Sequence, residues 1–321
     1  MTDQAPNSLE ISRVAAALGD RYLIDGALGR GGAGTVYLGR EVRHWRRVAI
    51  KILDPAVAAR LGNQRFEREI RITARLQHPN ILPLLDSGQV DGVPYYVMPY
   101  LEAGSLRQRL EQDGPMPVVA AVRLISEVAD ALAAAHELGI THRDVKPENI
   151  LLSHGHAMIA DFGVARSVVE SRMFRSEQGA AIGTPTYMSP EQAAGDQVVD
   201  GRADQFSLAC VLHELLTGRP PFEGETAWAL IASRFRGPGA LVRPEHIPVA
   251  LWEVLATALA VSPDDRFASV GDLVAALAAC VSIPVMAADG GGPEPVEESS
   301  RLQRFAAALA LLFIGPATWR L

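Results

Sequence analysis

Residues that could act on a phosphate group occur in four short stretches between residues 26 and 163. Residues 26–39, GALGRGGAGTVYLG, contain glycines in a G-x-G-x-x-G pattern, and glycine lets a backbone approach phosphate oxygens closely. Lys51 in VAIK adds a mobile cation for such oxygens. HRDVKPEN (142–149) and DFG (161–163) supply carboxylates suited to a base and to a hard metal ion. These residue types indicate chemistry on a phosphorylated ligand.

The context of the glycine pattern excludes two common phosphate sites. A dinucleotide fingerprint needs its glycines to open a helix, but the residues after Gly34 predict a strand. A P-loop needs Lys directly after its last glycine, whereas Thr35 follows Gly34. The pattern therefore predicts a glycine-rich hairpin between two strands, with Val36 and Ala49 lining an apolar slot for a base.

The secondary structure predicted around these residues changes from strands to helices along the chain. From 21 to 101, short runs rich in β-branched and aromatic residues predict strands, interrupted by one helix near 63–76. From 102 to 282, apolar residues recur at helical spacing. We therefore expect an α+β fold in which a small β-rich N-lobe (21–101) precedes a larger helical C-lobe (102–282).

The two ends of the chain differ from this body. Residues 1–20 predict an N-terminal extension with a short helix, and residues 283–301 are rich in Gly, Pro and Glu, as in a flexible linker. The apolar tail, 302–321, has an uncharged run shorter than the ~18 to 20 residues that cross a bilayer. Three interpretations of the tail stay open: a marginal membrane anchor, a helix packed on the body or a partner, and a disordered segment.

Composition narrows the class of protein. The chain has 321 residues, 48% of them hydrophobic, and can bury a substantial core. A net charge of -7 argues against nucleic acid as the main partner, because binding a phosphate backbone needs a basic face. Cys210 and Cys280 lie in apolar helical sequence and are expected to be buried rather than bridged. With no secretory signal at the N-terminus, we expect a cytoplasmic protein, with membrane contact only through the tail.

The ordered motifs GRGGAG, VAIK, HRDVKPEN, DFG and SPE resemble the protein kinases, specifically the bacterial serine/threonine kinases of eukaryotic type. The resemblance covers about residues 21–281. It implies the two-lobed kinase fold and transfer of the γ-phosphoryl group of ATP, with Mg²⁺, to Ser or Thr hydroxyls of protein substrates. It also implies autophosphorylation of the activation segment and a place in signal transduction.

Two other functions compete with this one. A pseudokinase is a binding module that keeps the fold without the chemistry, and it usually loses the lysine or one of the aspartates that are all present here. A kinase-like small-molecule phosphotransferase generally lacks the activation segment and the SPE motif, and this chain has both.

The resemblance implies a role for each polar motif residue. Asp144 would accept or orient the proton of the substrate hydroxyl, and Lys146 would neutralise the transferring phosphoryl group. Thr184 resembles the threonine that bonds both of them. Lys51 would hold the α- and β-phosphates and pair with Glu69.

The metal ligands implied by the resemblance are Asn149 and Asp161, which would hold Mg²⁺. Two acids of the N-lobe helix could pair with the lysine. A helical wheel places Glu69 near the apolar face and turns Glu67 about 100° away from it, and the family spacing to His78 also selects Glu69.

The nucleotide is expected between the hairpin and the segment VMPYLE. Adenine would use the carbonyl of Pro99 and the N–H of Leu101, so proline costs nothing at this carbonyl-only position. The residues expected to contact ATP are Leu28, Gly29, Arg30, Gly31, Gly32, Ala33, Gly34, Val36, Ala49, Lys51, Met98, Pro99, Leu101 and Leu151.

An activation segment lies between Asp161 and Glu191. Ser176 is the expected phosphoacceptor, with Ser167 and Ser171 as alternatives, and Arg143 could engage the phosphate bidentately.

Four further positions are expected to be structural. Glu191 should pair with Arg266, Asp204 should brace the catalytic loop, and His142 should be a hydrogen-bonded structural residue.

Overall fold

The N-terminal part of the chain folds as a five-stranded antiparallel sheet with strand order β1-β2-β3-β5-β4. The computed structural model describes residues 8–162 and 185–280, all within one compact unit, Met1–Ser282. The strands are β1 (Tyr22–Gly31), β2 (Gly34–Glu41), β3 (Arg47–Leu53), β4 (Asp86–Val90) and β5 (Val93–Pro99).

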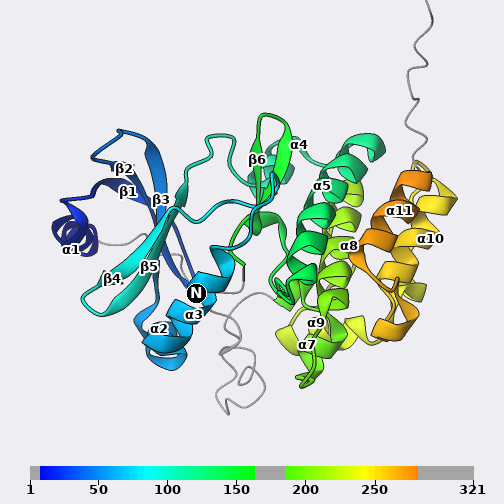
Figure 1. The fold of residues 1–321 in the computed structure, drawn as a ribbon. Helices are drawn as coiled ribbons and strands as arrows, with labels where there is room; N and C mark the ends of the chain where they lie inside the picture. Colours follow the sequence, from blue (N-terminus) through cyan, green and yellow to red (C-terminus); the bar gives the residue numbers. More distant parts are fainter. Residues whose placement is uncertain (1–7, 163–184, 281–321) are drawn as a thin grey trace, which may run out of the picture. The chain divides into compact units, whose positions relative to one another are not determined.

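The two faces of this sheet carry different helices (Figure 1). Alternation along a strand sends Val48 and Ile50 of β3 to one face and Ala49 to the other. The first face packs against α1 (Ser8–Leu18) through Val14 and Leu18. The helix of the N-terminal extension is therefore an integral layer of the N-lobe.

The second face packs against two helices, α2 (Pro55–Leu61) and α3 (Asn63–Thr73), whereas the sequence predicted one helix near 63–76. The side chain of Asp54 caps α2 by accepting from the N–H of Ala56 at 2.8 Å, and Pro55 takes the first helical position. Gly62, with φ of 72°, then separates the two helices. The prediction of a single helix was wrong because it missed this capping signal.

The remainder of the described chain is mainly helical, as expected. Its helices are α4 (Leu106–Asp113), α5 (Val118–Glu137), α7 (Pro190–Ala194), α8 (Gly201–Thr217), α9 (Ala227–Arg234), α10 (Val249–Ala258) and α11 (Val270–Cys280). The hairpin of β6 (Ile150–Ser153) and β7 (His156–Ile159) follows the short helix η1 (Pro147–Asn149). Helix α8 is buried on every side from residue 203 to 216 and packs on α5, α10 and α11 (Figure 1).

The two cysteines differ from each other. Cys210 in α8 is fully buried, and burial raises the pKa of its thiol to about 12. Cys280, the last residue of α11, is only half-buried, so the expectation of a buried thiol was wrong there. Cys280 packs against the core cluster from the last position of the helix, where only part of its side chain is covered.

The C-terminal end of the chain was expected to hold a linker and an apolar tail. Among residues 8–162 and 185–280, no helix is both long enough and apolar enough to cross a bilayer. The predicted linker, 283–301, and the apolar tail, 302–321, lie outside the described residues.

Candidate active site

The glycine-rich stretch forms the predicted hairpin, with a two-residue turn at 32–33 between β1 and β2. Gly34 has φ of 147°, and a Cβ there would lie 2.1 Å from the carbonyl oxygen of Ile52, so β3 requires this glycine. A Cβ on Gly29 or Gly31 would meet nothing within 4 Å. Packing of the described residues does not explain these two glycines, which leave the backbone open to a ligand.

The apolar residues expected around the base gather beneath this hairpin. Ala49 and Met98 are buried in one cluster, and Val36, Leu101 and Leu151 pack against it. Leu28 lies apart, 46% exposed, at a bulge in β1. Pro99 ends β5 opposite Val48, which packs on the other face of the sheet, so Pro99 is next to Met98 along the strand but its ring is not part of this cluster.

The HRDVKPEN loop brings its polar side chains together. The Nζ of Lys146 lies 3.0 Å from Oδ2 of Asp144, and Nδ2 of Asn149 donates to the carbonyl oxygen of Asp144 at 2.9 Å. Pro147 opens η1, which turns the chain so that residues 144, 146 and 149 converge. A carboxylate beside an ammonium and an amide is an arrangement suited to a base near a phosphoryl group.

Asp204 of α8 holds this loop in place, as expected. The buried carboxylate of Asp204 accepts from the N–H of His142 at 2.8 Å and from that of Arg143 at 2.6 Å. Nδ1 of His142 accepts from the N–H of Asp144, which leaves Nε2 to donate to the carbonyl oxygen of Ala160 at 2.9 Å. Asp204 thus braces the loop, and His142 is a structural residue; both expectations are confirmed.

The expected pair of Glu191 and Arg266 is also confirmed. Two nitrogens of the Arg266 guanidinium donate to the two carboxylate oxygens of Glu191, each at 2.8 Å. The side chains are 0% and 6% exposed, so the pair is a bidentate contact inside the C-lobe.

Asp161 is the point where the N-lobe and the catalytic loop meet. Its Oδ2 lies 2.5 Å from Nζ of Lys51, and its Oδ1 accepts from the hydroxyl of Tyr96 at 2.5 Å. Burial raises the pKa of Asp161, but the Lys51 ammonium and the Tyr96 hydroxyl outweigh it and hold that pKa below its usual range. Burial and the neighbouring carboxylate raise the pKa of Tyr96 well above its ordinary value, so the phenol is the donor.

Backbone geometry sets apart two residues next to these groups. Arg143 and Asp161 have φ of 65° and 64°, in the left-handed region that non-glycine residues rarely occupy. Such strain persists only where the surroundings hold it, and it clusters at functional sites. Here the surroundings are the contacts of Asp204 and Lys51 just described.

Glu69 and Lys51 have different partners in this structure from those expected. Oε1 of Glu69 accepts from Nε of Arg65 at 3.2 Å, whereas Lys51 donates to Asp161. The wheel argument does hold, because the Glu69 side chain is 20% exposed and that of Glu67 is 57% exposed and paired with Arg71. The pairing of Lys51 with Glu69 stays a prediction for the nucleotide-bound protein.

The residues expected to hold Mg²⁺ have the right donor chemistry. The carbonyl oxygen of Asn149 accepts from the N–H of Ala160 at 2.9 Å, which ties Asn149 to the residue before Asp161. Its amide nitrogen is used by Asp144, so its amide oxygen is the atom that suits a cation. One carboxylate and one amide oxygen fit a small hard ion that takes its other ligands from water and phosphate.

Sequence reasoning missed two groups of residues near the loop. Arg107 of α4 contacts Glu148 at 2.9 Å, Glu214 at 2.8 Å and the hydroxyl of Tyr187. A separate hollow beside Phe162 is lined by four arginines: Arg65, Arg68, Arg75 and Arg143. Arg65 and Arg68 lie on α3 and Arg75 just after it, whereas Arg143, which the sequence singled out for a phosphate, comes from the catalytic loop. Only the fold shows that the two segments line one hollow.

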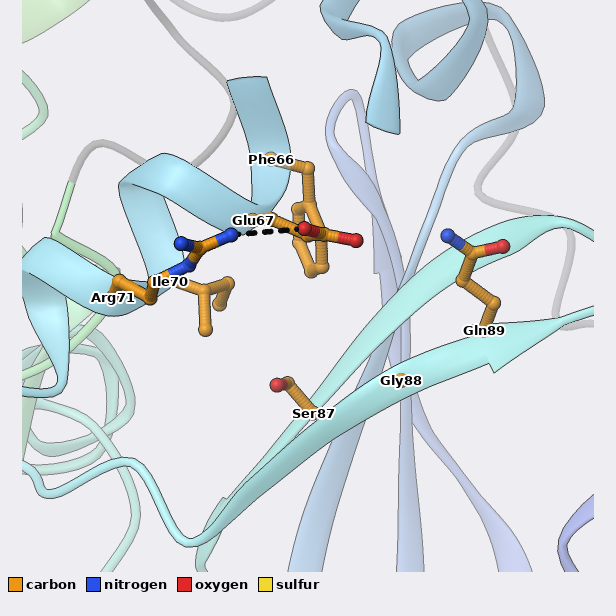
Figure 2. A pocket seen from close by; sticks show the side chains of 7 residues that line it. All are labelled: Phe66, Glu67, Ile70, Arg71, Ser87, Gly88 and Gln89. Carbon is orange, nitrogen blue, oxygen red and sulfur yellow. Dashed lines mark hydrogen bonds and ion pairs between the residues drawn. The ribbon is translucent and has the colours of Figure 1, made fainter. Parts of the chain in front are cut away.

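A further hollow lies between α3 and β4 on the N-lobe (Figure 2). Phe66 and Ile70 point into it from the helix, Ser87 lies on the strand side, and the ion pair of Glu67 with Arg71 lies at its helix side. None of the residues expected to act in catalysis or to bind nucleotide or metal lines this hollow.

Residues 163–184 of the predicted activation segment lie outside the described residues, and with them the four that were given roles: Ser167, Ser171, Ser176 and Thr184. Their expected roles stay predictions.

The fold and the convergence of these motifs define the class of protein. Residues 22–274 match the family described as "Protein kinase domain", and the chain belongs to this family. The solved structure of Rad53 1-466 in complex with AMP-PNP has the same fold, with a TM-score of 0.66 at 24% identity, covering 80% of this chain and 65% of that chain.

Relatives similar in sequence are bacterial serine/threonine-protein kinases. PknH of Mycobacterium tuberculosis (strain ATCC 25618 / H37Rv) is 40% identical over 279 residues, which are 85% of this chain and 44% of that protein. PknD from the same strain is 41% identical over 78% of this chain and 38% of that protein. PknB of Mycobacterium leprae is 40% identical over 81% of this chain and 43% of that protein. The chain thus spans less than half the length of these relatives.

Proposed function

We propose that the chain is an active serine/threonine protein kinase that transfers the γ-phosphoryl group of ATP to hydroxyls of protein substrates. The observation that carries the proposal is the convergence of Asp144, Lys146 and Asn149 in one braced loop, next to Asp161 and Lys51. Phosphoryl transfer asks a protein mainly for positioning and charge neutralisation, and these groups supply both.

Each side chain has a task in the transfer. Asp144 accepts or orients the proton of the attacking Ser or Thr hydroxyl, and Lys146, 3.0 Å from it, neutralises charge on the phosphoryl group. Lys51 leaves Asp161 for the α- and β-phosphates of ATP and then pairs with Glu69. Thr184 bonds Asp144 and Lys146 when the substrate is in place.

ATP binds between the glycine-rich hairpin and the apolar cluster of Ala49, Met98 and Leu151. The hairpin backbone at Gly29 and Gly31 covers the phosphates, because neither position carries a side chain. Asn149 and Asp161 hold Mg²⁺ through oxygen atoms. When bound, the ion supplies positive charge that neutralises the phosphates.

Transfer of label from γ-labelled ATP tests this function. Wild type is expected to label Ser or Thr of itself or of a generic protein substrate, and Asp144→Asn to lose at least about 100-fold in rate, since the general base is removed. Wild type that transfers no more than Asp144→Asn would show a binding module. Label on a small-molecule hydroxyl in place of protein would show a different phosphotransferase.

Phosphorylation of the activation segment is proposed to order it. The hollow lined by Arg65, Arg68, Arg75 and Arg143 presents a dense set of guanidinium groups to a phosphate. Ser176→Ala is therefore expected to remove the rise in activity that follows autophosphorylation, with Ser171→Ala as the matched control. Peptide mapping that finds no phosphate from Ser167 to Ser176 on fully active enzyme would contradict this.

For the chain as a whole we propose a kinase domain at 21–282 in the cytoplasm, a linker at 283–301 and a tail at 302–321 that contacts a membrane. The apolar run of the tail supports the last point. Deleting 302–321 is expected to move the protein from the membrane fraction to the soluble fraction. Full-length chain found entirely in the soluble fraction would contradict the contact.

A further inference from the structure

Tyr96, in the middle of β5, has no part in the proposed function so far. Its side chain is buried, with 5% of the residue exposed, and its hydroxyl donates to Oδ1 of Asp161 at 2.5 Å. The β3–β5 register places it directly opposite Lys51, whose Nζ bonds Oδ2 of the same carboxylate and lies 5.8 Å from the centre of the Tyr96 ring. One residue thus contacts both members of the central ion pair.

The hydroxyl needs an explanation that packing alone does not give. Tyr96 lies in the cluster that contains Ala49, Met98 and Ala160, where an apolar ring of the same shape would fill the space. A buried hydroxyl costs free energy unless it is hydrogen-bonded, and here its partner is a functional carboxylate. The position of the hydroxyl is fixed because the ring is held by the sheet.

Lys51 and Tyr96 differ in their freedom to leave Asp161. The lysine ammonium ends a flexible four-carbon stem, and its proposed task takes it to the phosphates of ATP. The phenol of Tyr96 stays with its strand. When Lys51 moves, Oδ2 of Asp161 is released while Oδ1 remains bonded to Tyr96.

We infer that Tyr96 is a positioning residue for the Mg²⁺ site, holding the carboxylate of Asp161 in one rotation so that Oδ2 is presented to the ion. The inference rests on the proposed role of Asp161 as a metal ligand. Side chains that hydrogen-bond a ligating carboxylate orient it, and their loss weakens metal affinity.

Tyr96→Phe tests the inference, with Tyr95→Phe as the matched control. Tyr95 is the adjacent residue, fully buried on the other face of the sheet, and its hydroxyl is bonded by Arg21. The same substitution there removes one buried hydroxyl without touching Asp161. The probe is a nonhydrolysable ATP analogue, whose affinity for each full-length variant is measured in EDTA and across a titration of Mg²⁺.

The expected result for Tyr96→Phe is a half-saturating Mg²⁺ concentration raised about tenfold, with affinity in EDTA unchanged. Tyr95→Phe should match wild type in both measurements. A Mg²⁺ requirement that is unchanged or lowered in Tyr96→Phe overturns the inference. Equal losses in EDTA and Mg²⁺ also overturn it, because they indicate general damage to the pocket. If the affinity of wild type for the ATP analogue does not depend on Mg²⁺, the assignment of Asp161 as a metal ligand is wrong, and the inference falls with it.

Discussion

Two ion pairs, Lys51 with Asp161 and Glu191 with Arg266, link distant parts of the chain in opposite ways. The first is a single contact of 2.5 Å between side chains that are 13% and 19% exposed. The second is bidentate, and Arg266 also donates to three backbone carbonyl oxygens, those of Arg202, Ala260 and Val261. Lys51 contacts one carboxylate oxygen, whereas Arg266 is surrounded by acceptors.

The difference matches what each pair must do. A lysine that has to reach ATP phosphates needs a contact that it can exchange, and a point charge on a flexible stem provides that. A pair that only holds the C-lobe together can be buried, provided that every donor is satisfied. Removing one partner then leaves an uncompensated charge in the interior. We therefore expect the first pair to control activity and the second to control stability.

The largest expected effect is that of Arg266→Met on folding. It leaves the buried Glu191 carboxylate without its cation, so the free energy of unfolding should fall by about 3–5 kcal/mol, measured by urea denaturation. Adding Glu191→Leu should recover part of the loss, since the stranded charge is then gone. A loss below about 1 kcal/mol would place this pair in the class of weak surface contacts.

Lys51→Met should show the converse behaviour. Removing a cation that stabilises phosphate charge should lower kcat/KM for ATP about 100- to 1000-fold. The free energy of unfolding should change less than in Arg266→Met, because Tyr96 still bonds Asp161. A variant that keeps its activity, or that loses as much stability as Arg266→Met, would break the contrast between the two pairs.

A smaller effect is expected for Glu69→Gln, which tests whether Lys51 pairs with Glu69 when nucleotide is bound. Gln keeps an acceptor oxygen but loses the negative charge that pairs with Lys51, and weakening this charge-assisted contact by about 1.5 kcal/mol should lower kcat/KM roughly tenfold. Glu67→Gln, two positions along the same helix, is the matched control and should stay within about twofold, because its side chain is 57% exposed and contacts Arg71. Equal effects of the two substitutions would remove the special role of Glu69.

Sequence patterns predicted much of this site because its motifs are local. The loop of Asp144, Lys146 and Asn149 is encoded within eight consecutive residues, and Pro147 sets the turn that brings them together. The strand that contains Lys51, and the glycine-rich hairpin that precedes this strand, follow from residue type alone. The family resemblance supplied the roles, and the fold comparison confirmed the architecture.

The features that the sequence did not reveal depend on which strands and helices are neighbours. In the sequence Tyr96 is an ordinary strand residue, and only the pairing of β3 with β5 places it opposite Lys51. The contacts of Arg107 with Glu148 and Glu214 likewise join α4, the catalytic loop and α8. The missed helix α2 is different, because Asp54 followed by Pro55 is a local start signal that could have been used.

A structure of the chain with Mg²⁺ and a nonhydrolysable ATP analogue would show whether Lys51 exchanges its partner while the pair of Glu191 and Arg266 stays fixed. We expect that Lys51 leaves Asp161 for the phosphates and Glu69, that Tyr96 keeps its bond to Oδ1, and that Glu191 and Arg266 do not move. Lys51 still bonded to Asp161 beside a bound nucleotide would contradict this expectation.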